Sequence, residues 1–201
     1  MKTCPFCLIL ILATPALAAI NQVQSKANWS GGATSCAVQF NFGTTTNNLV
    51  VVWTLWTSTS ALASVSDNTA LDVFASAVGP TLQSASNTSA QIFYAKNIHG
   101  TTNPITVSFS GGSATSTGCV AVEYSGADLN YPLDSASAGY STALNPTGLL
   151  DSGTVAPANA NLLLFGGGTT DYIARLAGSR ERVHGDSVDF RQHHGADDRV
   201  G

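Results

Sequence analysis

Charged side chains are scarce in this 201-residue chain, and arginine is absent from residues 19–174. Two lysines, Lys26 and Lys96, stand there against seven acidic residues, which leaves a net charge of −5 (2 − 7). Such a segment has no basic stripe with which to neutralise a phosphate backbone. The composition therefore argues against nucleic acid as a partner, and solubility must come from the many serine and threonine hydroxyls.

The chain also lacks an apolar run of the roughly 20 residues that a bilayer-spanning helix needs. Its first residues, MKTCPFCLILILATPALAA, contain one lysine, a short apolar stretch and the small-residue site Ala16-Leu17-Ala18. This order is typical of a secretory signal peptide, although a membrane anchor is the alternative. We predict that residues 1–18 are removed by cleavage after Ala18 or Ala19, that no membrane span remains, and that the protein is secreted or displayed at the cell surface.

Only four cysteines occur, and Cys4 and Cys7 lie within the predicted signal peptide. The remaining two, Cys36 and Cys119, would meet an oxidising compartment, where paired thiols are usually joined. We interpret them as a disulfide. Two separately buried free cysteines are the alternative, because Cys36 shares the strand parity of its apolar neighbours and Cys119 does not.

No convincing 3.6-residue periodicity follows the signal peptide, and short β-like stretches are separated by polar turns instead. The predicted strands cover residues 34–42, 49–56, 63–66, 71–75, 91–96, 105–110, 119–126 and 161–165. The stretch LVVVWTLW, Leu49–Trp56, is apolar on both parities and predicts a central strand covered on both faces. Turn residues between the strands at 91–96 and 105–110 predict a hairpin. The long connection 126–160 should pack on the fold or add an edge strand near Leu149 or Val155.

This pattern predicts an all-β fold, an antiparallel β-sandwich of immunoglobulin-like or jelly-roll-like type, as a single domain over residues 19–174. Trp53 lies downstream of Cys36, as the immunoglobulin pattern requires. However, Thr117 occupies the position of the tyrosine expected two residues before the second cysteine. The topology therefore stays open.

Four short stretches together carry a family resemblance: SVSDN (64–68), IFYAKNIHG (92–100), ITVSFS (105–110) and VAVEYSG (120–126). Over residues 20–174 the chain resembles the Ser/Thr-rich, Ig-like β-sandwich domains of uncharacterised secreted and surface proteins of environmental bacteria. The resemblance implies an extracellular bacterial module and brings no catalytic residues with it. The chain departs from the family after Asp67, where Asn68, Thr69, Ala70 and Leu71 follow.

Residues 175–201 differ in composition from everything before them. They hold all five arginines and three of the four histidines, with five acidic residues balancing the charge. Two readings stay open. The coding frame slips near Gly178, because a one-base shift permits the strand-like string Gly-Phe-Thr-Val-Ile, or the segment is a disordered polar tail.

Candidate catalytic and metal-binding groups are few. No Gly-x-Ser-x-Gly elbow occurs. His99 is the only histidine before the tail, and it lies in a predicted turn. Glu123 with Asp128 is the nearest pair of carboxylates for a glycoside hydrolase, although structural hydrogen bonding explains Glu123 as well. Residues in the tail could ligate a transition metal, but their spacing matches no established metal site. Aspartate and asparagine residues in two loops could bind calcium, and they are explained equally well by Asx turns. The tail residues are His184, Asp186, Asp189, His193 and His194, and the loop residues are Asp67, Asn68, Asp128, Asn130 and Asp134. We expect no metal, no cofactor and no enzymatic activity.

Three aromatic residues remain as candidates for ligand contact: Trp56 at a strand end, and Tyr131 and Tyr140 in the long connection. Aromatic faces at the rim of a sandwich suit a glycan or a surface protein, although each ring could instead cover the core. The sequence thus predicts an exported, non-enzymatic module of adhesive, binding or structural type. A carbohydrate-binding domain is the first alternative, and a hydrolase using Glu123 is the second.

Overall fold

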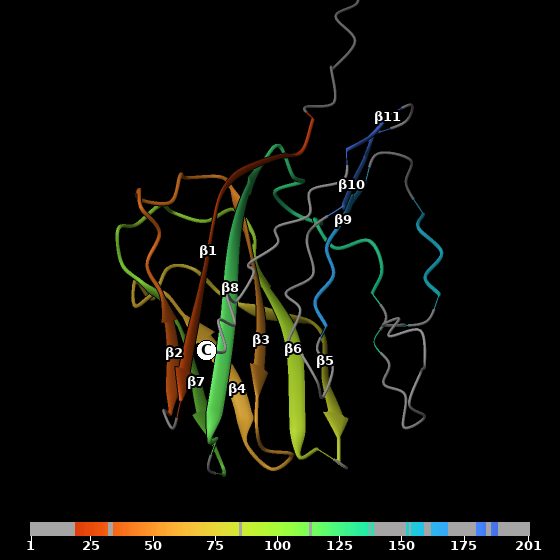
Figure 1. Ribbon diagram of the computed structural model, residues 1–201. Helices are drawn as coiled ribbons and strands as arrows, with labels where there is room; N and C mark the ends of the chain where they lie inside the picture. Colours follow the sequence, from red (N-terminus) through yellow and green to blue (C-terminus); the bar gives the residue numbers. More distant parts are fainter. Residues whose placement is uncertain are drawn as a thin grey trace, which may run out of the picture.

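The computed structural model describes residues 19–31, 34–84, 86–112, 114–136, 138, 152, 154–158, 162–168, 180–183 and 186–188. Their secondary structure is all β, and two antiparallel sheets pack face to face (Figure 1). The five-stranded sheet has the order β1 (Asn21–Gly31), β8 (Ser116–Ser125), β3 (Leu49–Trp56), β6 (Thr88–Ala95) and β5 (Ala75–Gln83). The three-stranded sheet has the order β2 (Ser35–Val38), β7 (Ile105–Ser110) and β4 (Leu62–Ser66). The predicted β-sandwich is confirmed.

Successive strands from β1 to β5 alternate between the two sheets. In the larger sheet β8 pairs with β1 and β3, and β3 also pairs with β6. In the smaller sheet β7 pairs with β2 and β4. In an immunoglobulin fold the first, second, fifth and fourth strands share a sheet. Here the first strand pairs with the eighth instead, as in a jelly roll built from two Greek keys. Of the two sandwich topologies expected, the strand order fits the jelly roll.

Local predictions succeeded unevenly. The expected hairpin between the strands at 91–96 and 105–110 is wrong, because β6 belongs to the five-stranded sheet and β7 to the other. The strand expected at 71–75 is a loop, and the chain becomes extended only at Ala75, where β5 begins. Likewise, the strand expected to reach Phe42 ends at Val38. The strands β1 and β5 were not anticipated.

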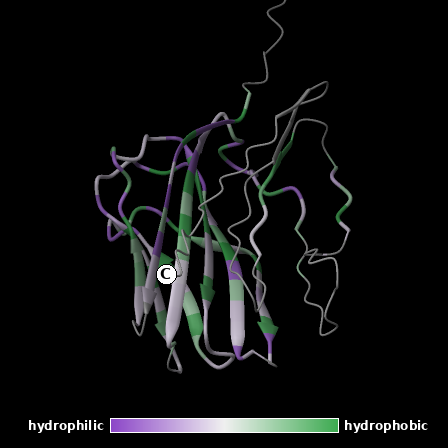
Figure 2. Cartoon of the chain, in the orientation of Figure 1, coloured by the Kyte–Doolittle hydropathy of each residue, from purple (hydrophilic) through white to green (hydrophobic). Residues whose placement is uncertain are grey.

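Strand β3 is buried along its entire length, as its sequence predicted. One face, with Val50, Val52 and Trp56, packs into the core between the sheets. The opposite face belongs to a second apolar cluster, in which Leu49 and Val51 join Val122 and Tyr124 of β8. Residues of the chain before β1 and after β8 cover this cluster: Ile20, Ala127, Leu163 and Phe165. The chain at Ala127 and at residues 163–165 therefore packs on the outside of the five-stranded sheet. Hydrophobic residues are concentrated in the strands (Figure 2).

The edges of the five-stranded sheet are dissimilar. Strand β1 forms one edge and is mostly hydrophilic (Figure 2). Strand β5 forms the other, and its pairing with β6 shifts register twice, between Ser76 and Val78 and between Val78 and Thr81. Pro80 lies within the second shift and has no N–H with which to extend a ladder. Such an edge resists pairing with another chain.

A third, small sheet combines β9 (Leu162–Leu164) with β10 (Arg180–Val183) and β11 (Asp186–Val188). Part of the arginine-containing tail thus has strand backbone, paired with β9 from Arg180↔Leu164 to Arg182↔Leu162. Whether a frame slip produced the tail's composition stays a prediction. Val155 lies in a described loop rather than in an edge strand, and Leu149 lies outside the described residues.

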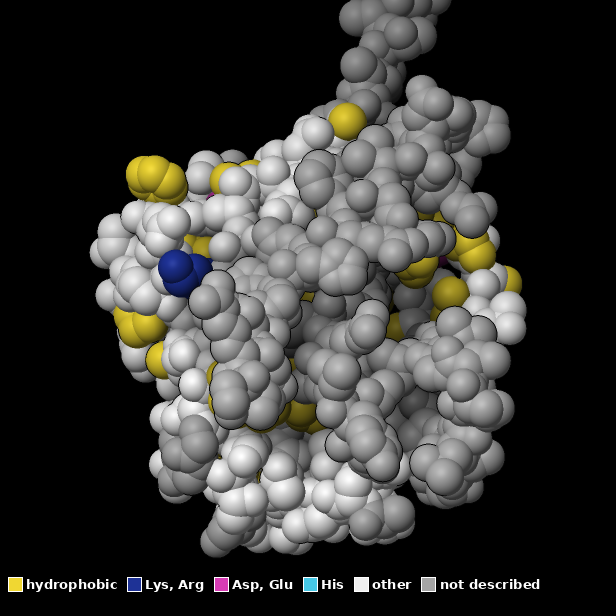
Figure 3. All heavy atoms as spheres, viewed as in Figure 1, with side chains coloured by type: hydrophobic (Ala, Val, Ile, Leu, Met, Phe, Trp, Pro, Cys, Tyr) yellow, Lys and Arg dark blue, Asp and Glu magenta, His cyan; other side chains and the backbone are white. Residues whose placement is uncertain are grey.

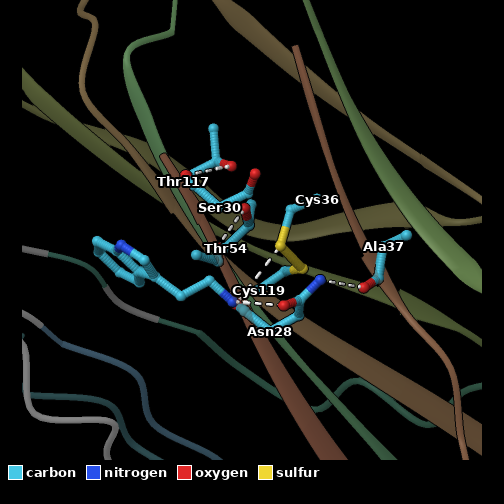
Figure 4. The surroundings of a disulfide bond; sticks show 9 residues. Asn28, Ser30, Cys36, Ala37, Thr54, Thr117 and Cys119 are labelled. Atoms are coloured by element: carbon cyan, nitrogen blue, oxygen red, sulfur yellow. Dashed lines mark hydrogen bonds between the residues drawn. A yellow bond between two sulfur atoms is a disulfide. The ribbon is translucent and has the colours of Figure 1, made fainter. Parts of the chain in front are cut away.

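The predicted disulfide between Cys36 and Cys119 is present (Figure 4). It joins β2 of one sheet to β8 of the other, with the Cα atoms 6.1 Å apart, and both cysteines are buried. The alternation of residues around Cys119 argued against the disulfide. That argument fails because β8 carries apolar residues on both of its faces. Cys119 and Ala121 face the core between the sheets, whereas the alternate residue Val122 belongs to the outer cluster.

Candidate binding surface

Four loops meet at one end of the sandwich. The strand registers place them together, because Val38 pairs with Ile105, Val50 with Ala95, and Leu49 with Tyr124. We call this end the upper rim, because it lies at the top of Figure 1, and define it as residues 39–48, 67–74, 96–104 and 126–134. The lower end carries the turns at residues 57–61, 84–87 and 111–115.

Backbone hydrogen bonds join two of these loops as if they were short strands. The N–H of Thr44 donates to the carbonyl of Thr101 at 2.8 Å, and the N–H of Asn47 donates to that of Ile98 at 2.8 Å. The Thr44 hydroxyl oxygen accepts the N–H of Thr101 at 2.9 Å. Loops 39–48 and 96–104 therefore form one hydrogen-bonded unit, and their backbones hold a defined shape.

A histidine–aspartate pair attaches the third loop. The Nδ1 atom of His99 lies 2.8 Å from Oδ1 of Asp72, and the same oxygen accepts the backbone N–H of His99 at 2.9 Å. The Asp72 side chain is 3% exposed, whereas that of His99 is 53% exposed. Among the described residues no hydroxyl or thiol hydrogen-bonds a ring nitrogen of His99. The pair thus ties loop 67–74 to loop 96–104 and has no nucleophile beside it.

The fourth loop is ordered around Asp128. Its Oδ1 accepts the backbone N–H groups of Asn130 at 2.7 Å and Tyr131 at 2.8 Å. The hydrogen bonds from Tyr131 and Asn130, assisted by the positive charge of Lys96, hold the pKa of Asp128 below its usual value of 3.8. Lys96 also donates to the carbonyl of Asn130, and its ammonium lies 5.6 Å from the ring centroid of Tyr131. Lys96 thereby connects loop 126–134 to loop 96–104.

These loops present large apolar side chains to solvent. Tyr131 is 85% exposed, and Phe42 and Val73 are each 78% exposed, one from each of three loops. Leu71, Leu129 and Leu133 of the upper rim are also among the exposed large hydrophobic residues. On the face drawn in Figure 3, the visible hydrophobic side chains lie in several separate patches. The upper rim therefore combines fixed backbone with exposed apolar groups, and its charged residues are Lys96, Asp67, Asp72, Asp128 and Asp134.

Of the three aromatic residues predicted to contact a ligand, Tyr131 alone is exposed within the described residues. The prediction that Trp56 contacts a ligand is wrong, because this residue is fully buried and its Nε1 donates to the carbonyl of Ala61 at 3.1 Å. Its ring lies 5.4 Å from that of Phe109 across the core. Position at a strand end suggested the rim, but the even parity of β3 directs this side chain inward. Tyr140 lies outside the described residues, as do Ala18 and the cleavage site.

Glu123 is fully buried, and its carboxylate accepts hydrogen bonds from three N–H groups. Oε1 accepts the backbone N–H of Thr45 at 2.7 Å and Nδ2 of Asn48 at 2.6 Å, and Oε2 accepts Nε2 of Gln24 at 2.6 Å. A group without exposed surface cannot protonate or attack a substrate. The geometry gives a hydrolase that uses Glu123 no support. Its visible role is to fix the start of loop 43–48 against β8 and β1.

Other candidate ligand sets serve the local backbone. Asp67 Oδ1 accepts both the N–H and the hydroxyl of Thr69, at 3.0 and 2.7 Å, as Asp128 does for its own turn. Among the described residues, histidine, cysteine and carboxylate side chains form no group of three that could hold a metal ion. The side chains of the tail residues considered as metal ligands lie outside this description.

Sequence reasoning missed Phe42, Val73 and Trp29 as exposed groups. Phe42 lies beyond the actual end of β2, and Val73 lies in a segment predicted as a strand that is a loop in the structure. Trp29 is 53% exposed on β1, where its ring lies on Gly118 of β8: a Cβ built on that glycine would stand 2.4 Å from Cε3. The available signal was an isolated tryptophan in the otherwise polar stretch NQVQSKANWSG.

Comparison with protein-family models, with curated proteins and with solved structures gave no match. The described part of the chain forms no helix that is long and apolar enough to cross a membrane. The function must therefore be argued from the site itself.

Proposed function

We propose that this chain is an exported, non-enzymatic β-sandwich module that binds its partner through the upper rim. One observation carries the proposal: hydrogen-bonded loops hold Phe42, Val73 and Tyr131 about four-fifths exposed. Exposed apolar side chains at one end of a domain can mark an interaction site in soluble proteins. Fixed loops lose little conformational entropy on binding, so that more of the contact energy is retained as affinity.

The scarcity of charge suggests the chemistry of the partner. Lys26 and Lys96 are the lysines of residues 19–174, and no arginine accompanies them. The upper rim carries one lysine and four aspartates, and two of these, Asp67 and Asp72, have buried side chains. Apolar contact and hydroxyl or amide hydrogen bonds should therefore contribute more than charge. A glycan or the surface of another protein offers such contacts. The buried disulfide supports an oxidising, extracellular location.

Carbohydrate binding is the second candidate, and Tyr131 favours it. Among the described residues it is the most exposed large apolar side chain, and its ring lies next to the ammonium of Lys96. An exposed aromatic face beside a hydrogen-bond donor suits a sugar ring, which has an apolar face and hydroxyl edges. In this reading Tyr131 provides the stacking surface, and Phe42 and Val73 extend it.

The experiment applies the secreted protein to a glycan array and to an array of immobilised extracellular proteins. The variant Phe42→Ser/Val73→Ser/Tyr131→Ser should lose the binding signal at least 10-fold, on the order expected for removal of interface anchors. The matched control is Leu62→Ser/Leu82→Ser, which removes exposed leucines at the lower end. The control should bind normally.

The pattern of results separates the candidates. Signal on glycans that is abolished by Tyr131→Ala alone supports the carbohydrate-binding reading, whereas signal on proteins supports a protein-binding module. The proposal fails if the triple variant binds as well as the parent, if the control loses binding equally, or if neither array gives a signal.

A further inference from the structure

Trp29 is an exposed tryptophan on the outer face of the five-stranded sheet. It pairs with Gly118 of β8, which pairs in turn with Leu55 of β3, and residues paired in this way share a face. Gly118 alternates with Cys119, which faces the core, so the Trp29 side chain points away from the core. Tryptophan is highly buried on average in folded proteins, yet Trp29 is 53% exposed. Core packing therefore does not account for this residue.

The indole of Trp29 contacts the sheet along one edge. A Cβ built on Gly118 would stand 2.4 Å from Cε3 and 2.5 Å from Cζ3 of the ring. These two atoms lie on the side of the indole opposite to its N–H group. Within the described residues, Nε1 forms no hydrogen bond. The glycine thus supports the ring and leaves an aromatic surface and an N–H donor open to solvent.

Two hydroxyl groups lie in the next row of the same face. Ser116 precedes Gly118 by two residues, and the N–H of Thr57 donates to its carbonyl at 2.9 Å, which continues the ladder beyond Trp56. Side chains two residues apart on one face of a strand are about 7 Å apart. Ser116 and Thr57 are partly exposed, and within the described part of the chain neither hydroxyl forms a hydrogen bond. One ligand could therefore reach the ring and both hydroxyls.

This part of the outer face is neutral, since none of the residues in the two rows is ionisable. Lys26 of the same strand pairs with Ala121, which packs between the sheets, so the lysine belongs to the opposite face of β1. Its ammonium lies 3.4 Å from Oδ1 of Asn41. An anionic ligand would find no cation among these residues, whereas a neutral ligand with C–H and hydroxyl groups would require no ion to be desolvated.

We propose that Trp29, Ser116 and Thr57 form a binding site for a neutral polysaccharide chain of the cellulose or chitin type. The apolar C–H face of a sugar ring packs on the indole, and the sugar hydroxyls exchange hydrogen bonds with the two side chains and Nε1. An open sheet face has no walls to enclose a small molecule, but an extended chain with flat sugar rings can lie along it. None of the three residues belongs to the upper rim, so the site does not depend on the function proposed for that rim.

Tryptophan fluorescence reports occupancy of this site directly. The chain has three tryptophans, and Trp53 and Trp56 are only 2% and 0% exposed, so Trp29 alone should respond to a ligand. Cellohexaose or chitohexaose should shift the emission of the secreted protein to shorter wavelength and reduce its quenching by acrylamide. The sugar with the stronger response identifies the chain type. Maltohexaose, a curved α-linked chain, is the control and should give no change. The absence of a response to both extended sugars would overturn the proposal.

Calorimetry with the responding sugar separates the ring from its support. Trp29→Ala should weaken binding at least about 10-fold, as for an interface anchor, whereas Trp29→Phe keeps an aromatic face and should recover most of the affinity. Ser116→Ala should weaken binding about 2- to 10-fold, the value of one hydrogen bond. Gly118→Ala should also weaken it, because the ring must move away from the new methyl group. Urea titration checks that each variant is folded.

Two further variants locate the sugar on the molecule. The upper-rim variant Phe42→Ser/Val73→Ser/Tyr131→Ser should keep the full fluorescence response, since its substitutions lie outside β1 and β8. Leu62→Ala, which removes an exposed leucine from the other sheet, should bind as the parent does. If the upper-rim variant loses the response, or if Trp29→Ala binds the sugar as tightly as the parent, the sugar binds elsewhere and the proposal is wrong.

Discussion

The indole of Trp53 lies directly against the backbone of Gly167, since a Cβ built on that glycine would stand 2.0 Å from Cδ1 of the ring. Trp53 is 2% exposed on the outer side of the five-stranded sheet. The chain after β9 therefore protects this ring from solvent. Contact at this spot explains how a β-sandwich of this size can bury both faces of its central strand.

Replacing Gly167 by alanine should lift this covering segment from the sheet. The new methyl group has no room above a buried ring, and overpacking of this kind costs about 1–3 kcal/mol. In a Trp29→Phe background, which removes the exposed tryptophan, acrylamide should quench the fluorescence of the Gly167→Ala variant more strongly. Gly166→Ala is the matched control, because a Cβ there meets no atom within 4 Å. Equal quenching in the two variants would contradict the contact.

Loss of the Glu123 carboxylate should destabilise the fold. Glu123→Gln replaces one acceptor oxygen by an NH₂ group that faces N–H donors, and each buried donor left unpaired costs about 1–3 kcal/mol. The free energy of unfolding, measured by urea titration with circular dichroism, should fall by at least that amount. Asp128→Asn, at an exposed carboxylate that can still accept through its amide oxygen, should change it little. An unchanged stability in Glu123→Gln would show that these hydrogen bonds contribute nothing.

Removing the disulfide should weaken the fold by an amount set mainly by the length of chain that it closes. Cys36 and Cys119 are 83 residues apart, and loss of such a bridge typically costs about 2–5 kcal/mol. The variant Cys36→Ala/Cys119→Ala should unfold at lower urea concentration than the parent. Reduction of the parent with dithiothreitol should give a similar shift. A transition that does not move would mean that the two sheets need no covalent connection.

Gly118 should determine the position of the Trp29 ring. Alanine at this site would meet Cε3 at 2.4 Å, and the ring, being at the surface, should turn away rather than unfold the strand. We expect a cost of about 1 kcal/mol or less, typical of a surface change. Acrylamide should quench Trp29 more strongly in Gly118→Ala, because Trp53 and Trp56 are buried and contribute little to quenching. In a Trp29→Ala background, Gly118→Ala should no longer lower the free energy of unfolding by this amount.

Acid should loosen the loop at residues 128–131. The pKa of Asp128 is lowered in the folded protein, so its contribution to the loop is complete above the usual value of 3.8 and is lost as the pH falls through the lower folded pKa. The Asn130 and Tyr131 amide protons should lose protection against hydrogen exchange in that pH range. NMR measures this loss after correction for the pH dependence of intrinsic exchange. Asp128→Asn should abolish the excess change. A pH-independent protection factor in the parent would contradict this assignment.

The sequence predicted those elements whose side chains alternate or are apolar throughout. Strand β3 could be predicted because both of its parities are apolar, and the disulfide because two cysteines lie outside the predicted signal peptide. Strand β1 was missed because its side chains stay near solvent and show no pattern, and β5 because Gly79-Pro80 interrupts it. Strand pairing is set by contacts between distant segments, so the sequence could not distinguish a hairpin from a crossing between sheets after β6.

The same reasoning explains the mixed outcome at the candidate site. Tyr131 lies in a polar loop, where an aromatic side chain has little to cover, and its exposure could be predicted. Trp56 could not be placed, because at a strand end the choice between core and rim depends on one residue of register. Phe42 became visible as a surface group only when β2 was found to end at Val38.

The interrupted strand β5 limits what the molecule can build. Since Pro80 and two register shifts spoil that edge, a polymer cannot grow by stacking sheet upon sheet through it. Growth of a polymer through the sheets would therefore have to use another edge, such as β1, and the loops at the upper rim remain the alternative route to larger arrays.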